Sequence, residues 1–370
     1  MATVRFVHSD FLRLDTPIGG LADSPDWLRR LATGGVRQAV KNLIQTTISQ
    51  RADFLLIAGS VAQSDEDIEA ISRWLADQFE PLQRRGIKVV VAADSHTSAE
   101  ALRDVCDVIV RPGGVIGVQH EVGGGVRLQS VAATTAPDTS FTVAIGNDRG
   151  CILPNRIVYQ AVPGLSSTAN ADRRTTDGCL EVSAGPIQSV SPDEAADCGC
   201  ILVEVDLSTR EIQSTFLATD VIRFATEELS LPEVSTVDGL IAEISRTSRS
   251  LDRRSTQTVI VDWVLRTHVT TDLRSISDLS EMNLLTRLRQ FLQGGHRGFW
   301  PRSVRFSLDS AVQVITSSQD EAVEQYLAVA IGSQHSPDVI GGVGQCVHAK
   351  DGGGLSGELV TGLSLLRSAA

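Results

Sequence analysis

Short apolar runs and amphipathic stretches alternate along the N-terminal third of the chain. The apolar runs are rich in β-branched residues, which predicts buried strands. The stretches between them place apolar side chains three and four positions apart, which predicts helices. We expect strands at residues 4–10, 53–59, 87–94 and 107–112, and helices at residues 25–52, 64–86 and 97–106. This order predicts a largely parallel sheet covered by helices.

Polar residues follow the predicted strands at their carboxyl ends. The first strand ends in His8-Ser9-Asp10, the second in Gly59-Ser60 and the third in Ala93-Asp94-Ser95-His96. Ligands of parallel sheets bind outside the carboxyl ends of the strands, so these three strand ends define one candidate site. A serine at position 60 is a poor ligand for a catalytic metal, whereas an acid there would be a good one.

From about residue 115 the pattern changes to shorter strands separated by glycine turns. Their alternation predicts a second, more antiparallel sheet that packs against the first in a layered sandwich and closes near residue 230. Helical and strand patterns then alternate again, which predicts a compact α+β unit of about a hundred residues. We therefore expect domains at residues 1–230 and 231–335, followed by a C-terminal extension at residues 336–370.

Composition and charge narrow the class of protein. Of the 370 residues, 42% are hydrophobic but 4% are aromatic, so the core must rest mainly on aliphatic side chains. The formal net charge of -12 works against non-specific attraction of the whole chain to nucleic acid or to an anionic membrane. No apolar run is long enough for a membrane helix, and the N-terminus does not read as a secretory signal. We expect a cytoplasmic protein with no membrane partner.

The cysteines do not form a recognisable framework. They are scattered along the chain at Cys106, Cys151, Cys179, Cys198, Cys200 and Cys346. The spacing fits neither a disulfide scaffold nor a zinc module with paired C-x-x-C units, so reduced thiols are expected. Cys198 and Cys200 would point to one face of a strand, and we interpret them as small buried groups and not as half of a metal site.

Three segments resemble, in order and spacing, the first three motif blocks of the calcineurin-like metallophosphoesterases. They are "VRFVHSDFLRLDTPIGG", "ADFLLIAGSVAQSD" and "GIKVVVAADSHTSAEAL". A fourth segment, "AGPIQSVSPDEAADCGCILVEVD", is similar to the region after the last metal motif of the SbcD-type DNA-repair exonuclease subunits. The resemblance implies a layered αββα sandwich with a smaller α+β capping domain after residue 230. Active members of this family hold two divalent metals such as Mn and hydrolyse phosphoesters.

The metal motifs of that family are altered in this chain. Phe11 and Arg13 stand at the Asp-x-His positions. Asp10 could act as the aspartate ligand only if the alignment to the motif were shifted by one residue. Ser60 replaces the acid of the Gly-Asp block. The Gly-Asn-His block has become Asp94-Ser95-His96, with Ser95 at the asparagine and His96 at the histidine position. The resemblance therefore implies a vestigial site formed by Asp10, Arg13, Ser60, Asp94, Ser95 and His96.

The last family motif, Gly-His-x-His, falls near residues 163–166, which read Pro-Gly-Leu-Ser. No histidine occurs between His120 and His268, so no placement of that motif within the first domain can succeed. Hydrolysis by the two-metal route is therefore expected to be lost. We expect no bound cofactor.

The surviving polar residues allow two interpretations. In the first, Asp10 and Asp94 cap helices or accept backbone N–H groups, His8 is a satisfied core histidine, His96 begins a helix and His120 lies on a hairpin. In the second, Arg13 takes the place of the missing metal charge and forms a salt-bridged cluster with Asp10 and Asp94. A structure with Arg13 pointing to solvent would contradict the second interpretation.

Residues 287–305 form an arginine patch, "RLRQFLQGGHRGFWPRSVR", that contains no acid. Its candidate binding residues are Arg287, Arg289, Arg297, Trp300, Arg302 and Arg305. Arginines interleaved with aromatic side chains suit contacts to phosphates and bases. They equally suit a protein interface, which the acidic net charge favours slightly.

Three functions remain open. The favoured one is a non-catalytic scaffold or regulatory subunit, whose partner by resemblance is an SMC-like ATPase and which could also contact DNA or form a homodimer. The second is an active metal-dependent nuclease or phosphodiesterase with rearranged ligands, drawn from His8, Asp10, Asp94, His96 and His120. The third is a nucleic-acid-binding module that uses the arginine patch. No G-x-S-x-G elbow or G-x-G-x-x-G fingerprint supports a serine hydrolase or a dinucleotide enzyme.

Overall fold

The protein is described by a computed structural model that covers residues 3–308, except 112, 122–124, 132–140, 147–157, 165–171, 177–178, 210, 232–236, 251–256, 268–280 and 294–297. The chain divides into two compact units, Met1–Phe224 and Ala225–Ala370. The end of the predicted capping domain, after residue 308, and the predicted C-terminal extension lie outside the described residues.

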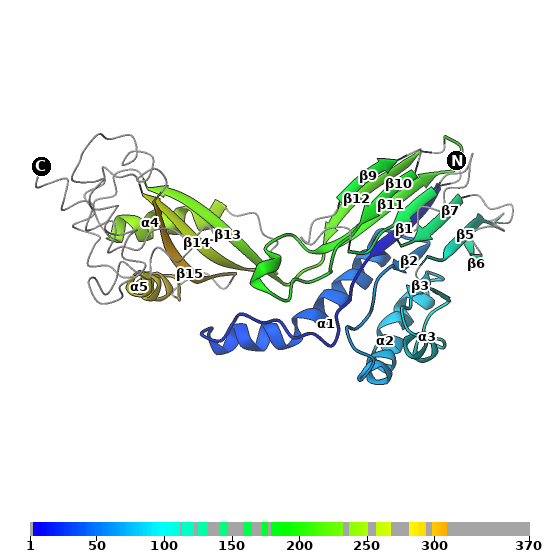
Figure 1. The fold of residues 1–370 in the computed structure, drawn as a ribbon, viewed down its shortest axis with the longest axis horizontal. Helices are drawn as coiled ribbons and strands as arrows, with labels where there is room; N and C mark the ends of the chain where they lie inside the picture. The colour runs from blue at the N-terminus through cyan, green and yellow to red at the C-terminus, as the bar shows by residue number, and fades with distance from the viewer. Residues whose placement is uncertain are drawn as a thin grey trace, which may run out of the picture. The chain divides into compact units, whose positions relative to one another are not determined.

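The first unit contains a six-stranded sheet (Figure 1). Its order is β12 (Ile212–Ala218), β11 (Gly199–Asp206), β1 (Thr3–Ser9), β2 (Phe54–Ile57), β3 (Lys88–Ala92) and β4 (Val108–Val110). Strands β1 to β4 are parallel to one another, and β11 and β12 are antiparallel additions beside β1. The predicted parallel sheet is therefore present, and its strand positions agree with the sequence pattern to within a few residues.

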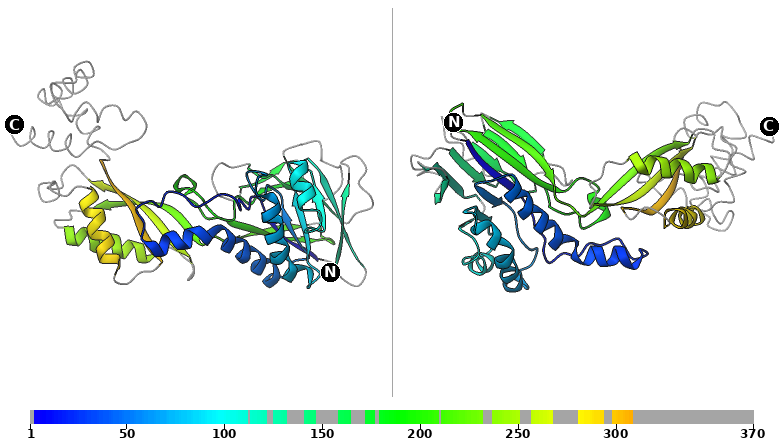
Figure 2. Two further views of the ribbon diagram at one scale, coloured as in Figure 1. Left: turned by 90° about the horizontal axis from the view of Figure 1, so that it is seen from below. Right: turned by 180° about the vertical axis from the view of Figure 1, so that it is seen from behind.

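Three helices cover one face of this sheet, as both views in Figure 2 show. They are α1 (Asp26–Ser49), α2 (Ile68–Gln83) and α3 (His96–Ala101). Helix α1 buries an apolar face that includes Leu28, Val36, Val40 and Leu43 at helical spacing. Val40 and Leu43, together with apolar side chains of α2, pack on Val7, Leu55 and Val91 of the strands to form the first core.

The second sheet also has six strands. Its order is β6 (Val126–Val131), β5 (Val115–His120), β7 (Phe141–Ile145), β8 (Val158–Ala161), β10 (Cys179–Ser183) and β9 (Asp172–Thr176). A second apolar core joins the two sheets, with Phe6 and Phe54 stacked at 4.6 Å and Tyr159 set edge-on to Phe6. The layered α/β sandwich predicted from the sequence is confirmed. Its helix, sheet and sheet layers lie within the described residues.

The second unit is built on a three-stranded sheet in the order β13 (Ile222–Leu231), β14 (Thr258–Thr267) and β15 (Phe299–Leu308). Helices α4 (Val237–Ser250) and α5 (Glu281–Gln293) pack on it through Ile244, Leu284 and Leu288 around Trp263. This is the α+β architecture predicted after residue 230, although the two units divide a few residues earlier, at Phe224. Within the described part of the chain, no helix is long and apolar enough to cross a membrane.

Candidate functional site

The chain beyond β1 runs beside the chain beyond β2. Backbone hydrogen bonds join Ala58 N to Ser9 O at 2.8 Å, Gly59 N to Asp10 O at 3.0 Å and Leu12 N to Ser60 O at 3.1 Å. The first two altered motif blocks therefore lie side by side at the carboxyl ends of the parallel strands. This is the place where ligands of such sheets bind.

His8 and Asp10 are completely buried between the two sheets. Nδ1 of His8 lies 2.7 Å from the Tyr159 hydroxyl, and Nε2 lies 2.8 Å from Oδ1 of Asp10, although the angle falls outside hydrogen-bond geometry. The other carboxylate oxygen of Asp10 accepts hydrogen bonds from the Ser183 hydroxyl and the Gly185 N–H, both at 2.9 Å. These partners satisfy Nδ1 of His8 and Oδ2 of Asp10, whereas Nε2 of His8 and Oδ1 of Asp10 face each other without a hydrogen bond among the described residues.

Phe11 occupies the centre of the candidate site. A Cβ atom on Gly59 would come within 2.7 Å of Cδ1 of the Phe11 ring, and a Cβ atom on Gly164 would lie 3.7 Å from its Cζ. Gly59 belongs to the altered Gly-Asp block, and Gly164 belongs to the segment where the last histidine motif is expected. Two positions that the resemblance assigns to metal motifs, Gly59 and Gly164, therefore lie against the Phe11 ring, which offers no lone pair to a metal.

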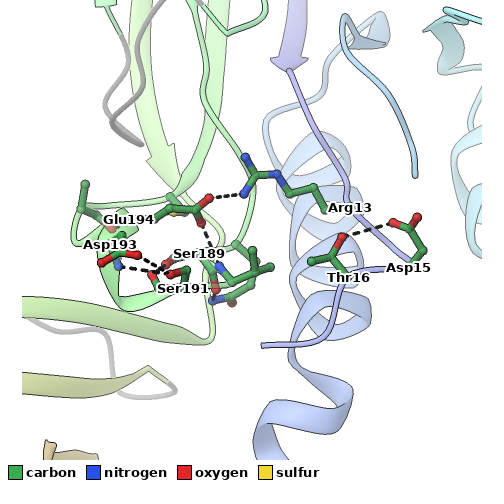
Figure 3. A network of polar contacts seen from close by, with 11 residues as sticks. Arg13, Asp15, Thr16, Ser189, Ser191, Asp193 and Glu194 are labelled. Carbon is green, nitrogen blue, oxygen red and sulfur yellow. Dashed lines mark hydrogen bonds and ion pairs between the residues drawn. The ribbon is translucent and has the colours of Figure 1, made fainter. Parts of the chain in front are cut away.

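Arg13 lies above this ring and is held by an acid from far along the chain (Figure 3). Its Nη1 donates to Oε1 of Glu194, and its guanidinium carbon is 5.8 Å from the centroid of the Phe11 ring. Oε2 of Glu194 accepts from Val190 N at 2.9 Å. The Arg13 side chain is only 20% exposed. A cation thus stands over the site as expected, but the cluster with Asp10 and Asp94 does not form, because Glu194 is the acid within reach.

Little in the sequence indicated that Glu194 would pair with Arg13. Glu194 lies in a short 3-10 turn, Pro192–Glu194, within the segment that resembles the region after the last metal motif. Asp15 is a second residue that sequence reasoning missed, and its carboxylate accepts from Gln63 N at 2.8 Å and Ser64 N at 2.8 Å. It fixes the loop after Ser60 to the chain after β1. The aspartate before a turn proline, Pro17, could have suggested such a role.

Arg13 and Glu194 also set the charge around a buried thiol. Cys198 is fully buried, and this burial raises its pKa well above the ordinary value. The nearby carboxylates of Asp220 and Glu194 raise this pKa further, whereas the Arg13 charge lowers it. The Cys198 thiol is therefore kept protonated, and it is neither a nucleophile nor a ready metal ligand.

The third motif block forms a helix start. Ser95 is the N-cap of α3, and its hydroxyl accepts from Ser98 N at 2.9 Å and donates to Oδ1 of Asp65 at 3.0 Å. Asp94 and His96 are exposed, and His96 is the first residue of α3. This matches the helix-start interpretation of His96. Ser60, at the end of the second block, is partly exposed, and its carbonyl is bonded to Leu12.

The alternative metal ligands do not come together. His8 and Asp10 are buried between the sheets, Asp94 and His96 flank the start of α3, and His120 ends β5 opposite Val126 in the second sheet. Among the described residues, no group of three or more His, Cys, Asp or Glu side chains could hold a metal ion. The residues present do not fit a two-metal centre, because an aromatic ring and a guanidinium stand at the positions that the resemblance assigns to metal ligands.

Some residues of the arginine patch make contacts within the second unit, and others are exposed to solvent. Trp300 is buried, and Arg289 stacks on it at 4.8 Å while donating to the carbonyls of Pro301 and Arg302. Arg302 pairs with Asp262 at a β-bulge, where the pairing of β14 with β15 skips one residue. Arg289, Trp300 and Arg302 therefore stabilise the second unit instead of presenting a binding surface. Arg287 and Arg305 are exposed, and Arg297 lies outside the described residues.

Comparison with known proteins gives one informative similarity. No protein-family model matches the chain. The chain is 26% identical over 96 residues to an uncharacterised metallophosphoesterase of Bacillus subtilis, YhaO. The match covers 26% of this chain and 24% of that protein, so it spans about a quarter of the length of the relative. Together with the layered sandwich, this similarity supports a distant relationship to the metallophosphoesterases at the level of the superfamily.

Proposed function

We propose that this chain is a homologue of the SbcD-type DNA-repair exonuclease subunits that no longer hydrolyses phosphodiesters and acts as a scaffold or regulatory subunit. The observation that carries the proposal is the Phe11 ring, which lies against both Gly59 and Gly164 at the ends of three altered motifs. Two-metal hydrolysis needs oxygen and nitrogen ligands at these positions. An apolar ring supplies none.

The charge at the site argues in the same direction. The Arg13 guanidinium lies over the ring and is paired with Glu194, and both side chains are about four-fifths buried. A fixed cation repels a divalent metal, and the repulsion is less screened here than in bulk water. Without bound metals the site has no means of generating hydroxide at neutral pH.

The partners follow from the resemblance alone. We propose an SMC-like ATPase as the partner and a cytoplasmic location, and we propose that the chain binds no cofactor. A homodimer and a DNA contact are the other assemblies to be tested. Sedimentation velocity of the chain alone and in a mixture with a candidate ATPase would distinguish the homodimer from the heteromeric complex.

Metal titration tests the loss of catalysis. EDTA-treated protein is titrated with Mn(II) in a calorimeter and then assayed with a DNA duplex and a chromogenic phosphodiester. We expect no saturable heat and no hydrolysis. A double variant, Phe11→Asp with Ser60→Asp, returns two carboxylates to the motif positions and is expected to gain Mn(II) binding. Tight binding of two ions by the natural chain together with hydrolysis would instead support the active enzyme with rearranged ligands.

The nucleic-acid-binding function has a separate readout. Arg287 and Arg305 are the exposed arginines of the patch within the described residues. Binding of a labelled DNA duplex whose affinity falls steeply with salt, and which is lost in the Arg287→Ala, Arg305→Ala double variant, would favour that function over the scaffold.

A further inference from the structure

A second hollow lies in the first unit, at the opposite end of the parallel strands from Phe11. It has a volume of about 440 Å³ and is formed where α1 and α2 end, where β2 and β3 begin, and beside Gly125 and Val126 at the β5–β6 hairpin. This volume is within the range of small-molecule sites. The hollow is separate from the Phe11 site.

The two helices that end at this hollow close with the same hydrogen-bond pattern. In α2, Gly86 N donates to Gln83 O and Ile87 N to Leu82 O, with Gly86 at φ 72°. In α1, Arg51 N donates to Ile48 O and Ala52 N to Thr47 O, with Arg51 at φ 52°. This is the Schellman motif, in which the left-handed position is usually glycine because a Cβ atom is strained there.

Arg51 therefore stands where Gly86 stands in the neighbouring helix end. An arginine in the left-handed conformation is less stable than a glycine by roughly 1 kcal/mol, and helix capping does not require it. Arg51 lines the hollow, and its side chain forms no hydrogen bond or ion pair in the described part of the chain. The neighbouring Arg85, by contrast, is already bonded to Pro81 O at 2.9 Å. Of the two arginines that line the hollow, Arg51 is thus the one whose side chain makes no polar contact with the described residues.

The opposite charge is supplied by Asp53. One oxygen of its carboxylate accepts from Arg5 N at 2.8 Å, while its backbone bonds both β1 and β3, so the side chain is rigidly placed. No hydrogen bond is formed by its other oxygen within the described residues, and Asp53 and Arg51 do not pair with each other. Burial raises the pKa of Asp53, so its ionised form would gain from a cationic partner.

Apolar side chains complete the lining. Ile48, Ala52, Ile87 and Val126 surround the two charges, and Ala52 and Ile87 are buried. A separated cation and carboxylate on an apolar wall are complementary to a molecule that carries both charges on an apolar body.

We propose that this hollow binds a small zwitterion of the apolar α-amino acid class. Its carboxylate would pair with Arg51, its ammonium group would pair with the second carboxylate oxygen of Asp53, and its side chain would pack on Ile48, Ile87 and Val126. This binding site goes beyond the scaffold function and does not depend on it.

Calorimetry with matched probes tests the proposal. The full-length chain is titrated at neutral pH with L-leucine, L-isoleucine, L-valine, L-methionine and L-phenylalanine. The best ligand is then compared with the analogue that lacks the amine and the analogue that lacks the carboxylate, which for leucine are 4-methylpentanoate and 3-methylbutylamine. We expect at least one amino acid to bind and both analogues to bind about tenfold more weakly or worse, since each lacks one charged contact.

Three variants connect binding to the named residues. Arg51→Gly and Asp53→Asn are each expected to raise the dissociation constant about tenfold or more. Arg51→Gly should not lower the thermal midpoint, because glycine suits the left-handed position. The control is Arg84→Ala, which removes an arginine at the end of the neighbouring helix α2 that pairs with Glu80 and does not line the hollow. Absence of binding by all five amino acids at about 10 mM, binding unchanged in both variants, or an analogue as tight as the amino acid would each overturn the proposal.

Discussion

The ring of Phe11 lies so close to the backbone of Gly59 that a single added methyl group on Gly59 would come within 2.7 Å of its Cδ1 atom. The ring fills space that the absence of a side chain at Gly59 leaves open, so a glycine at this position is required for packing.

Gly59→Ala is expected to destabilise the protein by about 1–3 kcal/mol, because the ring or the backbone must move. The matched control is Gly34→Ala, at an exposed helical position where a Cβ atom meets nothing within 4 Å and alanine should stabilise by about 1 kcal/mol. Denaturant unfolding followed by circular dichroism measures both. In a Phe11→Ala background the Gly59→Ala cost should fall but not vanish, because Asp10 O would still lie 3.0 Å from the added Cβ atom, and an unchanged cost would place the strain elsewhere.

The Arg13–Glu194 pair gives a second prediction. Arg13→Ala removes the ion pair and the contact with the Phe11 ring, whereas Arg13→Gly makes the same loss but suits the backbone at φ 51°. We expect the glycine variant to be about 1 kcal/mol more stable than the alanine variant in urea unfolding. Glu194→Gln should cost less than Glu194→Ala, because the amide oxygen still accepts from Val190 N. Equal stability of the Arg13 variants would indicate that the left-handed backbone is not strained.

The arginine patch gives a third prediction. Trp300→Ala should destabilise the protein by about 3–5 kcal/mol, since a buried ring is lost. Arg302→Ala leaves the Asp262 carboxylate without its cation and should cost about 1–3 kcal/mol. Arg305→Ala, at an exposed position, should stay within about 0.5 kcal/mol of the natural chain. Thermal unfolding of the three variants checks this order, and a neutral Trp300→Ala would return Trp300 to the set of binding residues.

Local sequence patterns predicted the fold more completely than they predicted the contacts of the candidate site. Apolar periodicity predicted the strands and helices because buried strands and one-sided helices leave a period that can be read along the chain. The replacement of metal ligands by Phe11, Arg13 and Ser60 is implied by motif order and by the resemblance, and it stays a prediction. The pairing of Arg13 with Glu194 could not be predicted, because it joins residues that 181 positions separate. The burial of Trp300 could not be predicted either, because it involves packing with Arg289 of a separate helix.

The buried thiols give a fourth prediction. Burial raises the pKa of Cys106 to about 12, and the neighbouring Asp107 charge contributes. Cys198 and Cys200 are fully buried. In the native protein at mildly alkaline pH, iodoacetamide should therefore alkylate these three cysteines much more slowly than in denaturant. Peptide mass spectrometry at timed intervals measures the rates. If Cys198 were alkylated as fast in the native protein as in denaturant, the structure around Arg13, Glu194 and Cys198 would have to open readily.

Asp53 gives a pH-dependent prediction that does not require a ligand. Burial is the largest cause of its raised pKa, and the N–H of Arg5 and the charges of His120 and Arg5 offset it in part. A carboxyl group with a higher pKa in the folded chain binds more protons there than in the unfolded chain, so its contribution to stability falls as pH rises through the folded-state pKa. Asp53→Asn keeps the oxygen that accepts from Arg5 N and removes this ionisation. It should therefore be more stable than the natural chain at pH near 7, and its advantage should shrink toward pH near 3, where Asp53 is protonated in both states. Urea unfolding at a series of pH values measures the difference. A constant difference across that range would mean that Asp53 is not held in a costly environment.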